Sequence, residues 1–511
     1  MTRLTEESMP ELPAAEAAGA TTLARVSAHK ARIRAALVAE LPEDIVLHAA
    51  EDLRPFECDG LSAYRRLPMI AVLPTTVEQV QSVLRICHAH DTPVVARGAG
   101  TGLSGGALPL ESGVLLSLAK FNRILDIDTA NRRATVQPGV RNLAISQAVD
   151  HLGLYYAPDP SSQIACSIGG NVAENSGGVH CLKYGLTTNN IVRLEIVTIE
   201  GERLTIGGAA LDSPGYDLLA LMTGSEGLLG VIVEVVVKLL PKPELAQCAL
   251  IAFDDVRAAG NAVAAIIKAG IVPAGLEMLD NPAIRATEDF VHAGYPREAA
   301  AILLCEIDGA AGEVADDMAR VRAVAEAGGA TEIRISRDDM ERALFWAGRK
   351  AAFPAMGRIS PDYYCMDGTI PRRALAEVLI GIGELSARYG QRVANVFHAG
   401  DGNLHPLILY DANRPGELEN TEAFGGAICR LCLDHGGTIT GEHGVGVEKI
   451  DQMCVQFPAA ELAQFHAVKA AFDDKTLLNP GKAVPTLHRC AEFGAMHVHH
   501  GELPHPELER L

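Results

Sequence analysis

Two histidines in the C-terminal half have a spacing that could hold a metal ion. In residues 392–411, RVANVFHAGDGNLHPLILYD, two strand-like runs flank Asp401-Gly402, a pair typical of a two-residue β-hairpin turn. A turn centred on this pair places His398 opposite His405, with both imidazoles within reach of one cation. The same pattern also fits two histidines that hydrogen-bond to backbone beside a turn, so a further ligand is needed to favour a metal site.

The segment TITGEHGVG, residues 438–446, offers such a ligand. A short β-branched run there ends in a glycine-rich loop that carries Glu442 and His443. Two imidazoles and one carboxylate leave coordination positions open, as a catalytic metal site requires. These residue types do not identify the metal, because several divalent ions accept the same ligands.

An arginine and a cysteine pair are two further candidates. Arg349 follows the only tryptophan, Trp346, by three residues, and its guanidinium could bind a carboxylate, although most isolated arginines form solvated ion pairs. Cys429 and Cys432 have metal-ligand spacing but lie in an apolar, helix-like stretch without a second cysteine pair. We therefore expect these cysteines to pack in the core, and the chain not to hold an iron–sulfur cluster of its own.

Two glycine-rich segments predict a large nucleotide ligand. RGAGTGLSGG, residues 97–106, directly follows a predicted strand, where exposed backbone N–H groups can cradle an anion. It contains the pattern G-x-G-x-x-G, but Pro109 and Gly113 break the helix that a Rossmann fold needs next, so that fold is excluded. The second segment, residues 158–185, combines glycine pairs with uncharged polar side chains suited to a bulky polar cofactor. A flexible loop explains one such segment, but two in one domain favour ligand binding.

The predicted elements indicate an α+β chain with two main domains. A strand, a helix capped by Thr75 or Thr76, and a second strand form an α/β unit at residues 69–97. Prolines at 241 and 243 predict a domain boundary, with alternating helices and strands beyond it. The other predicted helices are 23–40, 142–152, 217–222, 256–269 and 313–327, and the other predicted strands are 114–118, 124–127, 134–137, 194–199, 231–239 and 301–306.

Composition excludes several classes of function. The chain has 511 residues, of which 44 are basic and 64 acidic, and its net charge of −20 argues against nucleic acid as a partner. No apolar run reaches the roughly 20 residues of a membrane-spanning helix, and the N-terminus lacks an export signal. The odd number of cysteines, 11, suits a reducing cytosol, so we expect a cytoplasmic protein.

Six segments together resemble one protein family. RGAGTGLSGG, SIGGNVAENSGG, TGSEGLLG, HAGDGNLHP, GEHGVG and NPGK are similar to motifs of FAD-linked 2-hydroxy-acid oxidoreductases of the vanillyl-alcohol-oxidase type, and the similarity runs nearly end to end. The resemblance implies an α+β fold with a two-subdomain FAD-binding domain at 64–243 and an α+β cap, or substrate, domain at 244–484. An N-terminal helical segment, 1–63, and a histidine-containing tail, 485–511, would flank them.

The resemblance also implies a set of site residues. His398, His405 and Glu442 would bind a divalent metal such as zinc, His443 would be the general base, and Arg349 would bind the substrate carboxylate. FAD would contact residues of both glycine-rich segments and two residues outside them: Arg97, Gly98, Gly100, Thr101, Gly102, Ser104, Gly105, Pro158, Ser161, Ser167, Gly169, Gly170, Asn171, Ser176, Gly177, Ile232 and Asn479.

The implied reaction is oxidation of a small 2-hydroxy monocarboxylate by hydride transfer to the flavin. Members that act on dicarboxylic hydroxy acids have a lysine and an asparagine where this chain has Cys365 and Leu407, so we expect glycolate, oxidised to glyoxylate, with D-lactate as the alternative. A flavin-free metallohydrolase and a non-catalytic flavoprotein relay are alternatives of other classes.

The resemblance further implies protein partners. These are a second flavin-domain-like subunit and an iron–sulfur subunit, through which the chain could dock at the inner membrane. The histidine-containing tail is a candidate docking element.

Overall fold

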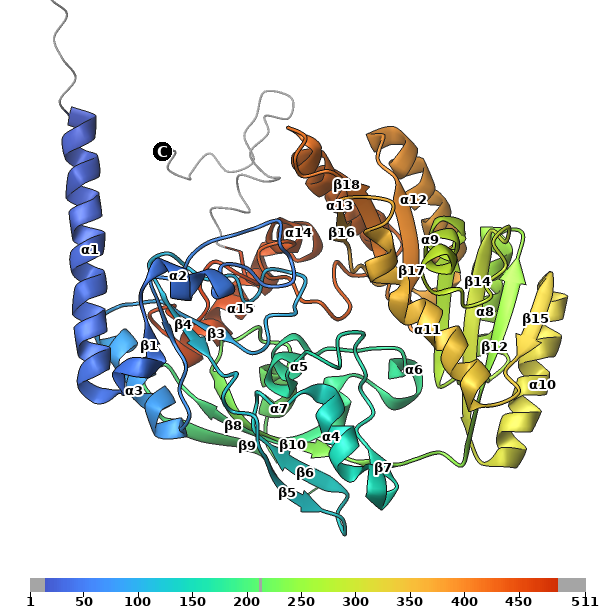
Figure 1. Ribbon diagram of the computed structural model, residues 1–511, viewed down its shortest axis with the longest axis horizontal. Coiled ribbons are helices and arrows are strands. Elements are labelled where there is room, and N and C mark those ends of the chain that lie inside the picture. The colour runs from blue at the N-terminus through green and yellow to red at the C-terminus, as the bar shows by residue number, and fades with distance from the viewer. Residues whose placement is uncertain (1–13, 211–213, 486–511) are drawn as a thin grey trace, which may run out of the picture.

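The computed structural model describes residues 14–210 and 214–485, which form two α+β halves lying side by side (Figure 1). The tail predicted at 485–511 lies outside the described residues except for Pro485. No helix within the described ranges is long and apolar enough to cross a membrane. Residue 243, the predicted boundary, lies between two successive strands, β11 (Leu240–Pro241) and β12 (Leu245–Phe253), where the chain passes from one half to the other.

The first half begins with a small sheet in the order β1-β2-β4-β3, in which β2, β4 and β3 are parallel. Helix α3 connects β2 to β3; the Thr76 side chain caps it by accepting from Gln79 N, and its buried face carries Val80, Leu84 and Cys87. This confirms the predicted α/β unit. The elements are α1 (Ala14–Glu40), β1 (Val46–Leu47), α2 (Ala50–Leu53), β2 (Ile70–Val72), α3 (Val77–Ala89), β3 (Val94–Arg97) and β4 (Val114–Ser117).

A second, antiparallel sheet in the order β5-β6-β10-β8-β9 completes the first half. Its central strand, β10, is the apolar run predicted as a strand at 231–239. The elements are β5 (Ile124–Asp128), β6 (Arg133–Val136), α4 (Asn142–Val149), β7 (Leu154–Tyr155), α5 (Ile168–Glu174), α6 (Cys181–Tyr184), β8 (Ile191–Val197), β9 (Arg203–Gly207), α7 (Leu218–Met222) and β10 (Val231–Lys238). The predicted helix at 142–152 ends earlier, at Val149, and continues as a 3-10 turn.

The second half is a seven-stranded antiparallel sheet, in the order β15-β12-β14-β13-β17-β18-β16, with helices on both faces (Figure 1). Alternate residues of one strand enter different cores, as Leu303 and Leu304 do, so both faces of the sheet are buried. The strands are β12, β13 (Gly275–Asp280), β14 (Ala301–Gly309), β15 (Glu332–Ile335), β16 (Asp362–Cys365), β17 (Val393–Phe397) and β18 (Pro406–Tyr410).

In the described part of the chain, one group of helices packs into the core on one face of this sheet, and a second group packs on the other. The first group is α8 (Val256–Lys268), α10 (Ala311–Ala327), α12 (Leu375–Tyr389) and α13 (Glu417–Asp434), and the second is α9 (Asn281–Val291) and α11 (Asp339–Met356). Cys429 and Cys432 lie on α13 and are fully buried among apolar side chains, as the missing second cysteine pair predicts.

The C-terminal segment returns from the second half to the first. After α14 (Ile450–Gln456) and α15 (Ala459–Phe472), the chain runs beside β3, where Leu477 O accepts from Val94 N and Asn479 N donates to Val94 O, each at 2.8 Å. Asp473, which is 1% exposed, holds this segment by accepting from Leu477 N at 3.0 Å and from Lys469 Nζ at 2.5 Å. The segment therefore joins the core of the glycine-rich half.

We expect the substitution Asp473→Ala to destabilise the fold by about 3–5 kcal/mol, because it leaves the buried Lys469 ammonium without its counterion. The loss should appear as a lower midpoint of thermal unfolding. Asp474→Ala, at the exposed neighbouring position, is the matched control and should unfold like the unmodified protein. Equal midpoints for the two variants would contradict the anchoring role of Asp473.

Candidate active site

His398, His405 and Glu442 converge at the edge of the second half. His398 follows β17, His405 precedes β18, and Glu442 lies in the loop after α13. The Glu442 Oε1 atom is 3.3 Å from His398 Nε2 and 3.0 Å from His405 Nε2. The two imidazole rings are 5.0 Å apart between centroids and nearly perpendicular, so their nitrogens point toward one region of space.

The hairpin that carries these histidines differs from its predicted register. His398 pairs with Asn403, and His405 O accepts from Val396 N, so the two histidines are diagonal neighbours rather than directly opposite. The predicted two-residue turn is wrong because four residues, 399–402, separate the first bridged pair. A shift of two positions keeps side chains on the same face of the ladder, which is why both imidazoles still reach Glu442.

A buried carboxylate, Asp367, shapes the loop that carries Glu442 and His443. Its Oδ2 accepts from Thr440 Oγ1 at 2.5 Å, from Gly441 N at 3.1 Å and from His443 N at 2.8 Å. Burial alone would raise the pKa of Asp367, but the nearby His443, Lys449 and His405 outweigh it and lower that pKa. The sequence gives no local sign of this role, since Asp367-Gly368 is indistinguishable from an ordinary turn.

His443 stacks on His405 with ring centroids 4.8 Å apart and ring planes 3° from parallel. Its Nε2 lies 3.7 Å from Glu442 Oε1. Burial lowers the pKa of the His443 imidazole, the predicted general base, from its ordinary value of 6.5 to about 4. At neutral pH the ring is therefore uncharged and has a free lone pair, but the lowered pKa also makes it a weaker base than an ordinary imidazole.

Arg349 is buried, not a solvated ion pair. It lies on α11 with 1% exposure, and its Nε donates to Glu277 Oε2 at 2.7 Å, while its Nη2 has no hydrogen-bond partner among the described residues. Glu277 Oε1 also lies 2.6 Å from His398 Nδ1. Burial opposes a charge on His398, but Glu277 and Glu442 raise its pKa well above the ordinary value. Sequence analysis missed Glu277. The one local sign of its role is that an acidic residue stands among the apolar residues of strand β13.

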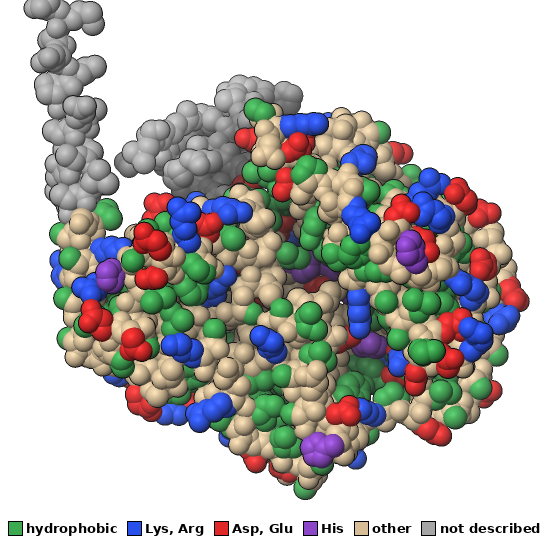
Figure 2. Space-filling model, in the orientation of Figure 1, with side chains coloured by type: hydrophobic (Ala, Val, Ile, Leu, Met, Phe, Trp, Pro, Cys, Tyr) green, Lys and Arg blue, Asp and Glu red, His purple; other side chains and the backbone are tan. Residues whose placement is uncertain are grey.

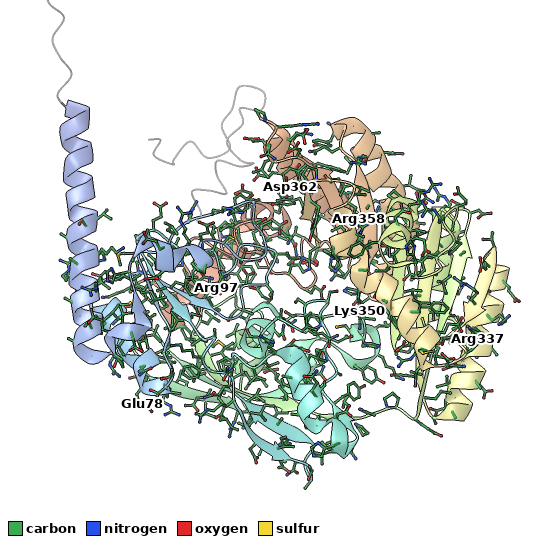
Figure 3. All side chains as sticks on the ribbon, in the orientation of Figure 1. Glu78, Arg97, Arg337, Lys350, Arg358 and Asp362 are labelled. Carbon is green, nitrogen blue, oxygen red and sulfur yellow. The ribbon has the colours of Figure 1, made fainter. Side chains whose placement is uncertain are left out.

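A cavity of about 380 Å³ between the two halves connects His405, Glu442 and His443 to the glycine-rich segments, whereas His398 and Arg349 are not among the residues that line it. Figure 2 shows a hollow in this region. His405, Glu442 and His443 line one end, and Lys350 and Phe353 of α11 contribute from the second half; Figure 3 labels Lys350 at the gap between the halves, opposite Arg97. The cofactor-site candidates in its lining are Arg97, Gly98, Gly100, Thr101, Gly102, Ser161, Ser167, Gly169, Gly170, Asn171, Ser176 and Ile232.

Comparison with known proteins identifies the family. Residues 68–207 match the model of an FAD binding domain, and residues 242–483 match that of the C-terminal domain of FAD linked oxidases. The chain is 66% identical over 476 residues to glycolate oxidase subunit GlcD of Escherichia coli strain K12, covering 93% of this chain and 95% of that one. The chain belongs to the FAD-linked oxidases. This membership shows an FAD-linked oxidoreductase and overturns the alternative of a flavin-free metallohydrolase.

Other relatives of this FAD-linked oxidase carry two different names. Glycolate oxidase subunit GlcD of Bacillus subtilis strain 168 is 40% identical over 428 residues, covering 84% of this chain and 91% of that one. A D-lactate dehydrogenase of Anaerostipes hadrus is 32% identical over 453 residues, covering 87% and 95%. The latter is the more distant of the two.

Solved structures confirm the expected fold of the FAD-linked oxidase. p-Cresol methylhydroxylase with substrate bound aligns with a TM-score of 0.77 at 19% identity, over 90% of this chain and 98% of that one. 4-Ethylphenol oxidase from Gulosibacter chungangensis aligns with a TM-score of 0.75 at 17% identity, over the same shares. The chain thus has the vanillyl-alcohol-oxidase type of FAD-binding fold with a C-terminal α+β cap domain.

The glycine-rich lining of the FAD-linked oxidase fits its cofactor. A Cβ atom added at Gly102 would meet no other atom within 4 Å, so the backbone there faces open cavity. A Cβ at Gly98 would instead collide with Ser167 Oγ, which accepts from Ala99 N and Gly170 N. The two glycine-rich segments therefore touch where they border the cavity.

Five predicted cofactor residues of the FAD-linked oxidase lie outside the cavity lining: Ser104, Gly105, Pro158, Gly177 and Asn479. Asn479 Nδ2 donates to Gly106 O and Glu226 O, at 3.0 and 2.7 Å, and so ties the C-terminal return to the first half. Gly177 lies against the metal-ligand candidates, since a Cβ there would be 2.5 Å from Glu442 Oε2. These residues stay predicted cofactor contacts, and in the structure they border or support the lining.

Two buried charged residues of the FAD-linked oxidase join its loops, and sequence analysis missed both. Glu226 accepts from Val445 N and Gly446 N, each at 2.7 Å, and so connects the first half to the loop beyond His443. Lys482 donates to Gly106 O at 2.9 Å and to Leu108 O at 2.5 Å, and burial lowers its pKa to about 7. Both lie inside highlighted motifs, TGSEGLLG and NPGK, where each resembled an ordinary turn residue.

We expect Gly98→Ala to lower the amount of FAD that copurifies, because the added methyl group must displace the Ser167 hydroxyl, which accepts hydrogen bonds from both glycine-rich segments. The flavin absorbance per protein measures this. Gly208→Ala is the matched control, since a Cβ at Gly208 meets nothing within 4 Å. Full flavin content in Gly98→Ala would show that the close contact of the two segments does not shape the cofactor site.

Proposed function

We propose that the chain is the FAD-linked subunit of a glycolate oxidase and converts glycolate to glyoxylate. The observation that carries the proposal is that one cavity joins the glycine-rich segments to His405, Glu442 and His443. The 66% identity to glycolate oxidase subunit GlcD supports glycolate as the substrate. Within the chain, residues 64–243 would be the FAD-binding domain and 244–484 the cap domain.

We further propose that His398, His405 and Glu442 hold a divalent cation such as zinc. Ligand atoms of a tetrahedral site with bonds of about 2.0–2.1 Å lie roughly 3.3 Å apart, which matches the 3.3 and 3.0 Å separations from Glu442 Oε1. The ligand atoms of a competing group, Cys365 with His405 and His443, also lie within 4.8 Å of one another. Burial raises the pKa of the Cys365 thiol well above its usual range, and a protonated thiol is a poor ligand.

The reaction removes two electrons and two protons from an alcohol. When bound, FAD supplies the two-electron acceptor, and the cation supplies positive charge that favours loss of the hydroxyl proton. Of the two ring nitrogens of His443, Nε2 is the one near the proposed ligand atom Glu442 Oε1, at 3.7 Å, and we assign it as the proton acceptor. Stacking on His405 and the bond from His443 N to Asp367 hold that ring in place.

Arg349 is the proposed partner of the substrate carboxylate. Its Nη2 is buried without a hydrogen-bond partner among the described residues, so an incoming carboxylate would satisfy it. Cys365 and Leu407, both buried, face each other across β16 and β18. Neither can neutralise a second carboxylate, which favours a monocarboxylate.

Electrons would leave the flavin through other proteins. The cysteine pair on α13 is packed in the core, which supports the need for a separate iron–sulfur subunit and a second flavin-domain-like subunit. The word subunit in the names of the glycolate oxidase relatives supports a multi-subunit assembly. We propose that the assembly is cytoplasmic and meets the inner membrane only through these partners.

We expect anaerobic mixing with glycolate to bleach the flavin absorbance, since the substrate supplies two electrons per turnover. D-Lactate is the matched comparison, and its specificity constant for flavin reduction should be lower. Faster reduction by D-lactate would assign the chain to the D-lactate dehydrogenases. A flavin that neither acid bleaches would leave only an electron-relay role.

We expect the two stacked histidines to differ in their effects. His443→Ala should retain FAD and zinc but lower the rate of flavin reduction by about 10²–10⁴-fold, the usual contribution of a general base. His405→Ala should lose zinc as well. Flavin absorbance, metal content and stopped-flow reduction separate the two outcomes, and an unaltered reduction rate in His443→Ala would refute its assignment.

A further inference from the structure

Glu277 is a buried carboxylate shared by two functional side chains. It lies on β13 with 0% exposure, surrounded by apolar strand residues. One oxygen, Oε1, is 2.6 Å from His398 Nδ1, and the other, Oε2, accepts from Arg349 Nε at 2.7 Å. A single carboxylate therefore connects a metal-ligand candidate on the hairpin to a substrate-binding candidate on α11.

The contact with His398 sets which ring nitrogen is free. An ionised carboxylate can only accept hydrogen bonds, so Glu277 Oε1 requires a hydrogen on His398 Nδ1. A cation that binds to His398 must displace the other ring proton, and with Nδ1 still protonated the lone pair is then on Nε2, the nitrogen 3.3 Å from Glu442 Oε1. Glu277 thus selects the tautomer that can bind a cation beside Glu442.

The contact with Arg349 sets the direction of the guanidinium. Because the Arg349 Nε donates to Glu277, the planar group is fixed about its long axis, and Nη2 remains without a partner among the described residues. The charge of Glu277 also offsets that of Arg349 in a site where an unpaired ion would cost several kcal/mol.

We propose that Glu277 is a positioning residue that couples cation binding to substrate binding. It holds His398 and Arg349 at one fixed separation, so that a small acid with a hydroxyl next to its carboxylate can meet the cation and the guanidinium together. This proposal rests on the proposed function of the site. The new element is that the Glu277 carboxylate controls both the affinity for the cation and the affinity for the substrate, although it touches neither substrate nor cofactor.

The substitution Glu277→Gln tests the proposal with little change of shape. A glutamine has one acceptor oxygen, and its NH₂ group would face a second donor, so one of the two contacts must break. We expect the zinc dissociation constant, measured against a competing chelator, to rise about 10–100-fold. We also expect KM for glycolate to rise, with flavin content unchanged.

Asp280→Asn is the matched control. Asp280 is another buried acid of β13, and its contacts are with Ala283 N and Asn395, away from the proposed ligands. This variant should keep the zinc affinity and KM of the unmodified protein. A similar loss in both variants would mean that any buried acid on this strand affects the site through the fold alone, which would overturn the proposal.

Two further outcomes are decisive. Unaltered zinc affinity in flavin-containing Glu277→Gln would overturn the proposal, even if glycolate oxidation were confirmed. If Glu277→Gln purifies without flavin, Glu277→Asp takes its place, because the shorter acid keeps the charge but cannot span both partners. The Glu277→Asp variant should also bind zinc more weakly. Full zinc affinity in that variant would refute the coupling. Failure of the proposed function itself is distinguishable, because the unmodified protein would then not be reduced by glycolate.

Discussion

Charge compensation in a buried space is the constraint on which the site depends. Glu277 and Asp367 are fully buried and the Glu442 side chain is only 10% exposed, so each carboxylate would cost several kcal/mol if it stood alone. The neighbouring imidazoles, guanidinium and ammonium offset them, with His398 placed between two of the carboxylates. A buried carboxylate is stabilised by a cationic side chain only at short range. The backbone segments that carry these charged groups must therefore lie close together.

The antiparallel sheet of the second half supplies that positioning. Strands β13, β17, β18 and β16 are neighbours in the sheet, so Glu277, His398, His405 and Asp367 lie at or next to adjacent strands. The loop with Glu442 has no strand of its own, and Asp367 orders it through its backbone N–H groups. The sheet thus positions His398 and His405 directly, and it positions Glu442 indirectly, through Asp367.

Flavin chemistry requires the candidate metal ligands of the second half to face the glycine-rich segments of the first half. Long-range contacts of the C-terminal segment join these two halves. On the side of the first half, Glu226 accepts from the backbone after His443. On the side of the C-terminal segment, Asn479 donates to Glu226 O and Lys482 donates to Gly106 O. These contacts are buried and short, so the cavity walls from different halves are held in one arrangement. The proposed coupling through Glu277 operates within that fixed frame.

Local signals in the sequence determined the α/β unit at 69–97, the strand at 231–239, the two glycine-rich segments and the residue types of the candidate site, because capping, periodicity and glycine content act over a few residues. The same-face placement of His398 and His405 also followed from strand alternation, although the hairpin register did not, since a four-residue loop and a two-residue turn both suit Asp401-Gly402.

Only the tertiary structure decided that Arg349 is buried beside Glu277, that Asp367 orders the Glu442 loop, and that Lys482 reaches back to the first half. These contacts join residues separated by 72 to 376 positions. Such contacts have no local periodicity to reveal them, because they arise from how sheets and helices pack.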